Sequence, residues 1–165
     1  MAKEDEIEGL TPEQPFADAG RVIIHNRFEA MWRRRDGTLA GDAEALHDMR
    51  VGSRRLRAAL DVFAAAFHGG EYRALSRLTA QLTDELGAVR DHDVMLLNLR
   101  KYRKRAAPDE RPGVDDLMGA LTDERTLARR ELRRFFDELD DAAYAQRMQD
   151  SYQLSAVSHQ LMADR

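Results

Sequence analysis

The 165-residue sequence contains no cysteine, which excludes disulfide bonds and thiolate metal ligands. It also lacks any apolar run approaching the roughly 18 residues needed to cross a bilayer. The first residues, MAKEDEIEGLTPEQ, are acidic and have no apolar stretch of the kind found in a secretory signal. A reducing cytoplasm fits these absences and is the location that we expect.

A strong positive charge is missing as well, since 26 Lys and Arg residues stand against 30 Asp and Glu residues. A generic nucleic-acid binder is expected to be strongly basic, so we do not expect that function. Residues 1–18 hold six of the acids and one of the bases, which leaves 24 acids and 25 bases in the remainder. We expect residues 1–11 to be a flexible acidic N-terminus and residues 12–165 to form a single domain.

Strand-like alternation and Asn-Gly hairpin signals are absent, and apolar residues recur at helical spacing throughout. The sequence therefore predicts an all-α protein, an antiparallel bundle of about five to six helices. The expected helices cover about residues 12–35, 43–67, 72–86, 91–104, 114–139 and 142–162, with a loop at 107–113. Thr11, Asp42 and Asp91 are the expected N-caps, and Gly87 is the expected end of the third helix.

Apolar stripes on these helices identify the residues expected to face the core. They are Ala17, Ile24, Phe28 and Met31; Ala45, Met49, Leu56, Leu60, Phe63 and Phe67; Leu75, Leu78, Leu82 and Leu86; and Leu117, Leu121, Leu132, Phe135 and Leu139.

The segment LHDMRVGSRRLRAAL, residues 46–60, is the most informative stretch of the chain. His47, Arg50, Arg54 and Arg57 share the helix face opposite the apolar stripe, and Arg55 lies beside them. Like charges on one helix face repel each other, so an anion over this face is the favoured interpretation. Guanidinium groups match phosphate oxygens in bidentate geometry, and His47 would add a further charge when protonated.

The alternative for this face is a solvated helix surface with acidic partners on neighbouring helices. Asp48, Asp61, Asp84 and Glu85 are the candidate partners. In the segment LGAVRDHDV, residues 86–94, Arg90 can reach a ligand or pair with Asp91 or Asp93. The sequence alone leaves both pairs of alternatives open.

Two further basic runs allow similar alternatives. The run RKYRKR, residues 100–105, ends a helix, where cations complement the helix dipole; attraction of a polyanion is the less favoured interpretation. Arg129, Arg130, Arg133 and Arg134 flank the apolar stripe of the fifth helix. Arg129 and Arg133 can face the same cavity as the arginines of residues 50–57, or can form an ordinary exposed face.

The chain shows no pattern typical of catalysis or of a metal site. The five histidines include no HxxxH pair, and there is no P-loop, GxGxxG or Ser-His-Asp order. We expect no catalytic residue, no cofactor and no bound metal, although a site assembled across helices from His25 and His47 stays open as an alternative.

The segment HDMRVGSRRLRAALDVF, residues 47–63, followed by LGAVRDHDVML, residues 86–96, resembles the CHAD family, the conserved histidine α-helical domain. The resemblance implies an all-α fold of two related helical bundles that binds inorganic polyphosphate on a basic surface. By motif match it implicates His47, Arg50, Arg54, Arg55, Arg57 and Arg90, with Arg129 and Arg133 added. The implied function is non-catalytic polyphosphate binding in the cytoplasm, alone or at polyphosphate granules. A protein-interaction scaffold and a histidine-based metal-binding domain are the alternatives.

The sequence departs from the family pattern in its C-terminal part. A second His-x-x-Arg segment is expected there, but Met162 stands three residues after His159. The chain thus resembles the N-terminal half of the family domain with one added helix. We expect a homodimer to restore the second half by twofold symmetry. Its expected apolar contacts are Tyr144, Met148, Tyr152 and Leu161.

Overall fold

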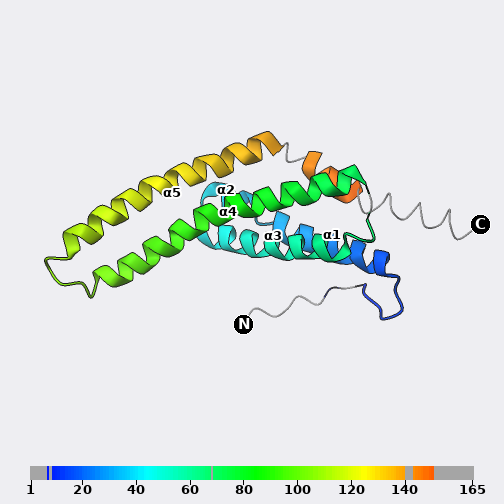
Figure 1. The fold of residues 1–165 in the computed structure, drawn as a ribbon, viewed down its shortest axis with the longest axis horizontal. Coiled ribbons are helices and arrows are strands. Elements are labelled where there is room, and N and C mark those ends of the chain that lie inside the picture. Colours follow the sequence, from blue (N-terminus) through cyan, green and yellow to red (C-terminus); the bar gives the residue numbers. More distant parts are fainter. Residues whose placement is uncertain (1–6, 8, 68, 140–142, 151–165) are drawn as a thin grey trace, which may run out of the picture.

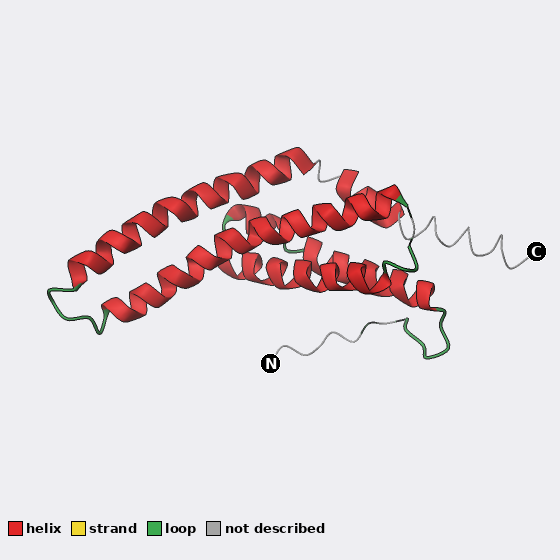
Figure 2. Cartoon of the chain, in the orientation of Figure 1, coloured by secondary structure: helices red, strands yellow, loops and turns green. Residues whose placement is uncertain are grey.

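The computed structural model describes residue 7 and residues 9–67, 69–139 and 143–150. Within these ranges the chain is helical and contains no strand, which confirms the predicted all-α bundle (Figure 2). The helices are α1 (Phe16–Trp32), α2 (Arg35–Ala40), α3 (Ala43–Phe63), α4 (Gly70–Arg103) and α5 (Arg111–Leu139). Residues 143–150 are helical too.

The helices pack in the spatial order α1, α3, α4, α5. Figure 1 shows α4 and α5 as a long hairpin whose far end extends beyond the three shorter helices. The first half of α4 therefore has α3 on one side and α5 on the other, whereas its second half is paired with α5.

Helix α1 begins later than the sequence predicts. Thr11 does not cap a helix; its carbonyl oxygen accepts a turn hydrogen bond from the amide of Gln14 at 3.2 Å. Pro15 is extended, with φ of −55° and ψ of 143°, and precedes the first helical residue, Phe16. A proline disfavours helical geometry in the residue before it, so Gln14 cannot continue a helix into Pro15.

The connection from α1 to α3 differs from the predicted loop. Helix α1 ends at Trp32, and the expected break at Asp36-Gly37 lies inside the short helix α2. Gly41 ends α2 with φ of 94°, a conformation that favours glycine. Asp42 caps α3 as predicted, because its Oδ1 accepts hydrogen bonds from the amides of Glu44 at 2.8 Å and Ala45 at 3.3 Å. Helix α3 ends at Phe63 rather than Phe67.

The predicted third and fourth helices are one continuous helix, α4, of 34 residues. Gly87 lies in its interior and does not end a helix, and Asp91 is not an N-cap. The buried stripe of Leu82, Leu86 and Val89 continues across this region. Burial of that stripe outweighs the roughly 1 kcal/mol that an interior glycine costs a helix.

The core lies mainly between α1, α3 and the first half of α4, with Leu132 and Phe136 of α5 closing it. Most predicted core residues are buried or packed against the core, but Leu117 is 49% exposed because it lies on the part of the hairpin beyond the other helices. Gly52 lets α1 approach α3 closely, since a Cβ at position 52 would lie 2.9 Å from Cβ of Met31.

Tyr144 and Met148 belong to this core and are fully buried within the chain. The prediction that they form a dimer interface is therefore wrong. Tyr152 and Leu161, the other residues named for that interface, lie outside the described residues, as does His159.

Candidate functional site

A groove of about 670 Å³ runs between α3 and α4 on the surface of the molecule. We call it the α3–α4 groove. Helix α3 lines it with three arginines at helical spacing, one alanine and one aspartate, and α4 lines it with two aspartates and three small residues. The lining residues are Arg50, Arg54, Arg57, Ala58, Asp61, Thr83, Asp84, Gly87, Ala88 and Asp91.

The amphipathic pattern of α3 explains why the arginines reach this groove. Met49, Leu56 and Leu60 are buried against the core. Residues three, four and seven positions apart share a helix face, so Arg50, Arg54 and Arg57 follow one another along a single edge of α3. The rigid helix, capped by Asp42, holds their backbone positions fixed.

Arg50 is the most enclosed of the three arginines, with a side chain 27% exposed. Its Nη2 lies 3.9 Å from Oδ1 of Asp91. Its Nε is shielded from solvent and has no hydrogen-bond partner among the described residues. Gly87 lies directly beneath, since a Cβ there would stand 3.7 Å from this Nε.

Arg54 and Arg57 are exposed. Within the described part of the chain, neither forms an ion pair with a carboxylate. Arginines elsewhere do so: Arg103 pairs with Asp115 and Arg125 pairs with Asp93. The donors of Arg54 and Arg57 are therefore available to a ligand.

The candidate acidic partners divide between different surfaces. Asp61 and Asp84 line the α3–α4 groove with the arginines, as the alternative of a solvated face expected. Asp48 pairs with Arg34 at 3.3 Å instead, and Glu85 lines a separate depression beside Arg134. The groove thus carries both signs of charge.

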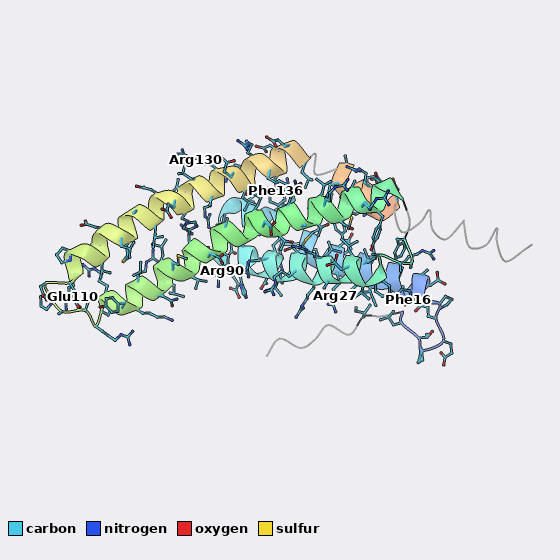
Figure 3. All side chains as sticks on the ribbon, in the orientation of Figure 1. Phe16, Arg27, Arg90, Glu110, Arg130 and Phe136 are labelled. Carbon is cyan, nitrogen blue, oxygen red and sulfur yellow. The ribbon has the colours of Figure 1, made fainter. Side chains whose placement is uncertain are left out.

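Arg55, His47 and Arg90 do not line the α3–α4 groove. Arg55 projects from the other side of α3 into a depression between α1 and α3. His47 is exposed on α3, one turn before Arg50. Arg90 is half-buried at the middle of α4, where the hairpin leaves α3 (Figure 3). The two expected partners of Arg90 face other residues: Asp91 approaches Arg50, and Asp93 pairs with Arg125.

Arg129 and Arg133 join α5 to the end of α2. Nη2 of Arg129 donates to the carbonyl oxygen of Gly41 at 3.1 Å, and Nη2 of Arg133 donates to that of Leu39 at 2.9 Å. Burial, followed by the positive charge of nearby Arg125, lowers the pKa of Arg129. These bonds fix the position of the hairpin and place both arginines away from the lining of the α3–α4 groove.

Gly87, Thr83 and Ala88 are lining residues that the sequence reasoning missed. Gly87 was assigned to a helix end, so its position in the groove was not expected. The signal that could have revealed it is the unbroken helical spacing of Leu82, Leu86, Val89 and Leu96, which are all buried on one continuous helix.

The described histidines, His25, His47 and His92, do not belong to a group of residues that could hold a metal ion. Nδ1 of His92 lies 2.7 Å from the carbonyl oxygen of Ala88, and its Nε2 lies 3.2 Å from Glu124. In the described ranges, no three His, Asp or Glu side chains are grouped so that they could hold a metal ion.

Among the described helices, none combines the length and the apolar character that a membrane span requires.

No curated protein and no solved structure matches the chain. The sequence model of the CHAD domain matches residues 22–161, which covers α3, the α3–α4 groove and most of the chain. The protein therefore belongs to the CHAD domain family.

Proposed function

We propose that this protein binds inorganic polyphosphate, without catalysing a reaction on it, along the α3 wall of the α3–α4 groove. One observation carries the proposal: Arg50, Arg54 and Arg57 line one edge of a rigid helix, and two of them have no carboxylate partner among the described residues. Membership of the CHAD family supports it. A cytoplasmic location, alone or at polyphosphate granules, belongs to the same proposal.

The chemistry is electrostatic and multivalent. Each guanidinium group offers a planar fork of donors that fits two phosphate oxygens. A long phosphate chain engages several such groups at once, which raises its affinity without requiring a new kind of contact. Asp84 and Asp91 on the opposite wall repel phosphate, so the chain would lie against α3.

The absence of catalysis is part of the proposal. The ten lining residues include no serine, cysteine or histidine, and the one hydroxyl among them, that of Thr83, donates to the carbonyl oxygen of Thr79 at 2.8 Å. The cations of the groove are suited to holding an anion rather than to cleaving one.

A protein-interaction scaffold is the second candidate, and the mixed charge of the groove favours it. Asp61, Asp84 and Asp91 stand in the same groove as the three arginines. A partner surface carrying both signs of charge would complement this pattern, whereas a uniform polyanion complements only the arginines.

A titration with four ligands distinguishes the candidates: long polyphosphate, orthophosphate, ATP and single-stranded RNA. We expect long polyphosphate to bind most tightly and orthophosphate most weakly. Its affinity should fall steeply as salt rises, by analogy with counterion release from nucleic acids. Equal affinity for polyphosphate and orthophosphate, or binding indifferent to salt, would contradict the proposal and favour the scaffold.

The homodimer stays a prediction. A twofold pairing of the α3 faces would double the number of arginines available to one polyphosphate chain. Its contacts cannot come from Tyr144 and Met148, which are buried in the core. Light scattering with and without polyphosphate tests it, and a monomer under both conditions would show the prediction to be wrong.

A further inference from the structure

A depression of about 390 Å³ lies between α1 and α3. We call it the α1–α3 depression. It is lined by apolar side chains and by two arginines, one from each helix, and the described residues that line it include no acid. They are Ile23, Arg27, Arg55, Ala58, Ala59, Val62 and Phe63. The α3–α4 groove differs in this respect, because three aspartates line it together with its arginines.

Arg27 of α1 (Figure 3) and Arg55 of α3 have no carboxylate partner among the described residues. Asp18 on α1 pairs with Arg21 instead, and Asp48 on α3 pairs with Arg34. The apolar side chains around the two arginines carry no hydrogen-bond acceptor. The donors of both guanidinium groups are therefore available to an anion.

The α1–α3 depression and the α3–α4 groove meet at Ala58, which lines both of them. Ala58 follows Arg54 by four residues and Arg55 by three, and residues at these spacings are neighbours on a helix surface. Arg54 lines the groove and Arg55 lines the depression, so Ala58 stands between them. It is exposed, and its side chain is a single methyl group, so the surface of α3 is low at this point.

The arginines around Ala58 are spread around α3 rather than along it. Arg54 and Arg57 are only about 4.5 Å apart along the helix axis, at a rise of about 1.5 Å per residue. Arg54, Arg55 and Arg57 have no carboxylate partner in the described ranges, and Arg27 faces them from α1. A linear anion that contacts all four must therefore run across the helix.

We propose that an extended phosphate chain crosses α3 at Ala58, and that Arg27 and Arg55 form a second anion-binding subsite in the α1–α3 depression. This inference rests on the proposed function and extends its site to α1. Asp84 and Asp91 on the α4 wall repel phosphate, whereas no acid lines the depression among the described residues. The chain therefore leaves the groove over Ala58 and not toward α4.

The test variant is Arg27→Gln with Arg55→Gln, and the matched control is Arg105→Gln with Arg130→Gln. Both control residues are exposed and line neither depression, and the same charge is removed in each case. Isothermal titration with long polyphosphate measures the affinity and the number of chains bound per protein. We expect the test variant to lose at least about fivefold more affinity than the control, with an unchanged number of bound chains, because one chain engages both subsites.

An equal loss of affinity in both variants would overturn the proposal. A smaller number of bound chains with unchanged affinity would overturn it too, because it would show two separate sites. If wild type does not bind polyphosphate, the proposed function fails with it. If binding depends on Arg50 and Arg54 but not on Arg27 and Arg55, the crossing alone is wrong. Thermal unfolding checks that the variants are folded, and Arg55→Gln alone, at an exposed position, repeats the test with one charge removed.

A bulky side chain at Ala58 tests the path of the chain. Ala58→Phe should block the crossing, because the ring would stand between Arg54 and Arg55 on the helix surface. In this background, Arg27→Gln with Arg55→Gln should cost no more affinity than the control pair. An undiminished effect of the two substitutions would overturn the crossing at Ala58.

Discussion

Arg50 of α3 lies across Gly87 of α4. Its Nε is 3.7 Å from the position that a Cβ of residue 87 would occupy, and its Nη2 is 3.9 Å from Oδ1 of Asp91. The guanidinium group therefore lies over the backbone of α4 at a distance that leaves room for a Cβ at residue 87. Arg50 thus lies beside α4 while it also lines the α3–α4 groove.

The double change Arg50→Ala and Arg54→Ala should weaken polyphosphate binding by at least about tenfold, because two of the three groove arginines are lost. The free energy of unfolding should change by less than about 1 kcal/mol, since neither side chain belongs to the apolar core. Isothermal titration with polyphosphate measures the first quantity, and chemical denaturation measures the second.

The matched control is Arg105→Ala with Arg130→Ala. Both residues are exposed, and Arg130 lies on the outer face of α5 (Figure 3). The control removes the same charge from the protein. An equal loss of affinity in both variants would show that net charge, rather than the groove, determines binding, and unfolding of the first variant would assign its arginines to structure.

Two interior glycines should respond in opposite directions to alanine. Gly87→Ala should raise the free energy of unfolding by up to about 1 kcal/mol, because alanine favours a helix and its Cβ would meet only an ordinary contact at 3.7 Å. Gly52→Ala should lower it by about 1–3 kcal/mol, because its Cβ would lie 3.0 Å from Cα of Met31 and force α1 away from α3.

Thermal and chemical denaturation of these two variants provide the measurement. Polyphosphate affinity of Gly87→Ala should stay within about twofold of wild type, since Arg50 keeps its place. Shifts of the same sign in both variants would contradict the difference in packing at the two glycines.

The helical class and most of the core could be predicted because burial follows a periodicity that the sequence displays directly. Leu56, Leu60 and Phe63 are examples on α3. Helix ends were predicted less well, because propensity at Gly87 suggested a break that the packing of Leu86 and Val89 overrides.

The candidate site could be predicted in part for a related reason. The spacing of Arg50, Arg54 and Arg57 along one helix is a local property and is visible in the sequence. The aspartates that face these arginines are determined by the packing of α4 against α3, and no local sequence pattern predicts that packing. Arg129 likewise lies near the end of α2 only because the hairpin returns there.

Arg129→Ala should lower the free energy of unfolding by about 1–3 kcal/mol, because the charged donor that bonds to the carbonyl oxygen of Gly41 is lost. Polyphosphate affinity should fall by less than about threefold, since the side chain does not line the groove. Arg130→Ala on the same helix is the control, with a change of about 0.5 kcal/mol or less. Lost binding with unchanged stability would instead make Arg129 a ligand residue.

Tyr144 should make the protein less stable in alkali. Burial raises the pKa of its hydroxyl to about 12, and that hydroxyl lies 2.9 Å from Oγ1 of Thr79. A tyrosine in the unfolded chain ionises near pH 10. The folded state therefore retains a proton that the unfolded state releases, so stability is complete below about pH 10 and falls as the pH rises toward about 12.

Tyr144→Phe should reduce this alkaline loss by about 2–3 kcal/mol, which is the free energy of a shift of about two pKa units. The phenyl ring keeps the contacts with Phe28 and Trp32, and Thr79 keeps its hydrogen bond to the carbonyl oxygen of Leu75 at 2.8 Å. The measurement is urea denaturation of both proteins from about pH 8 to about pH 12. The stability of the wild type should fall more steeply with pH than that of the variant. The stability of the variant should also fall, because burial raises the pKa of Tyr72 to about 12 in both proteins. Parallel curves would show that the hydroxyl of Tyr144 ionises equally well in the folded and unfolded chains, and that it is not buried in the core.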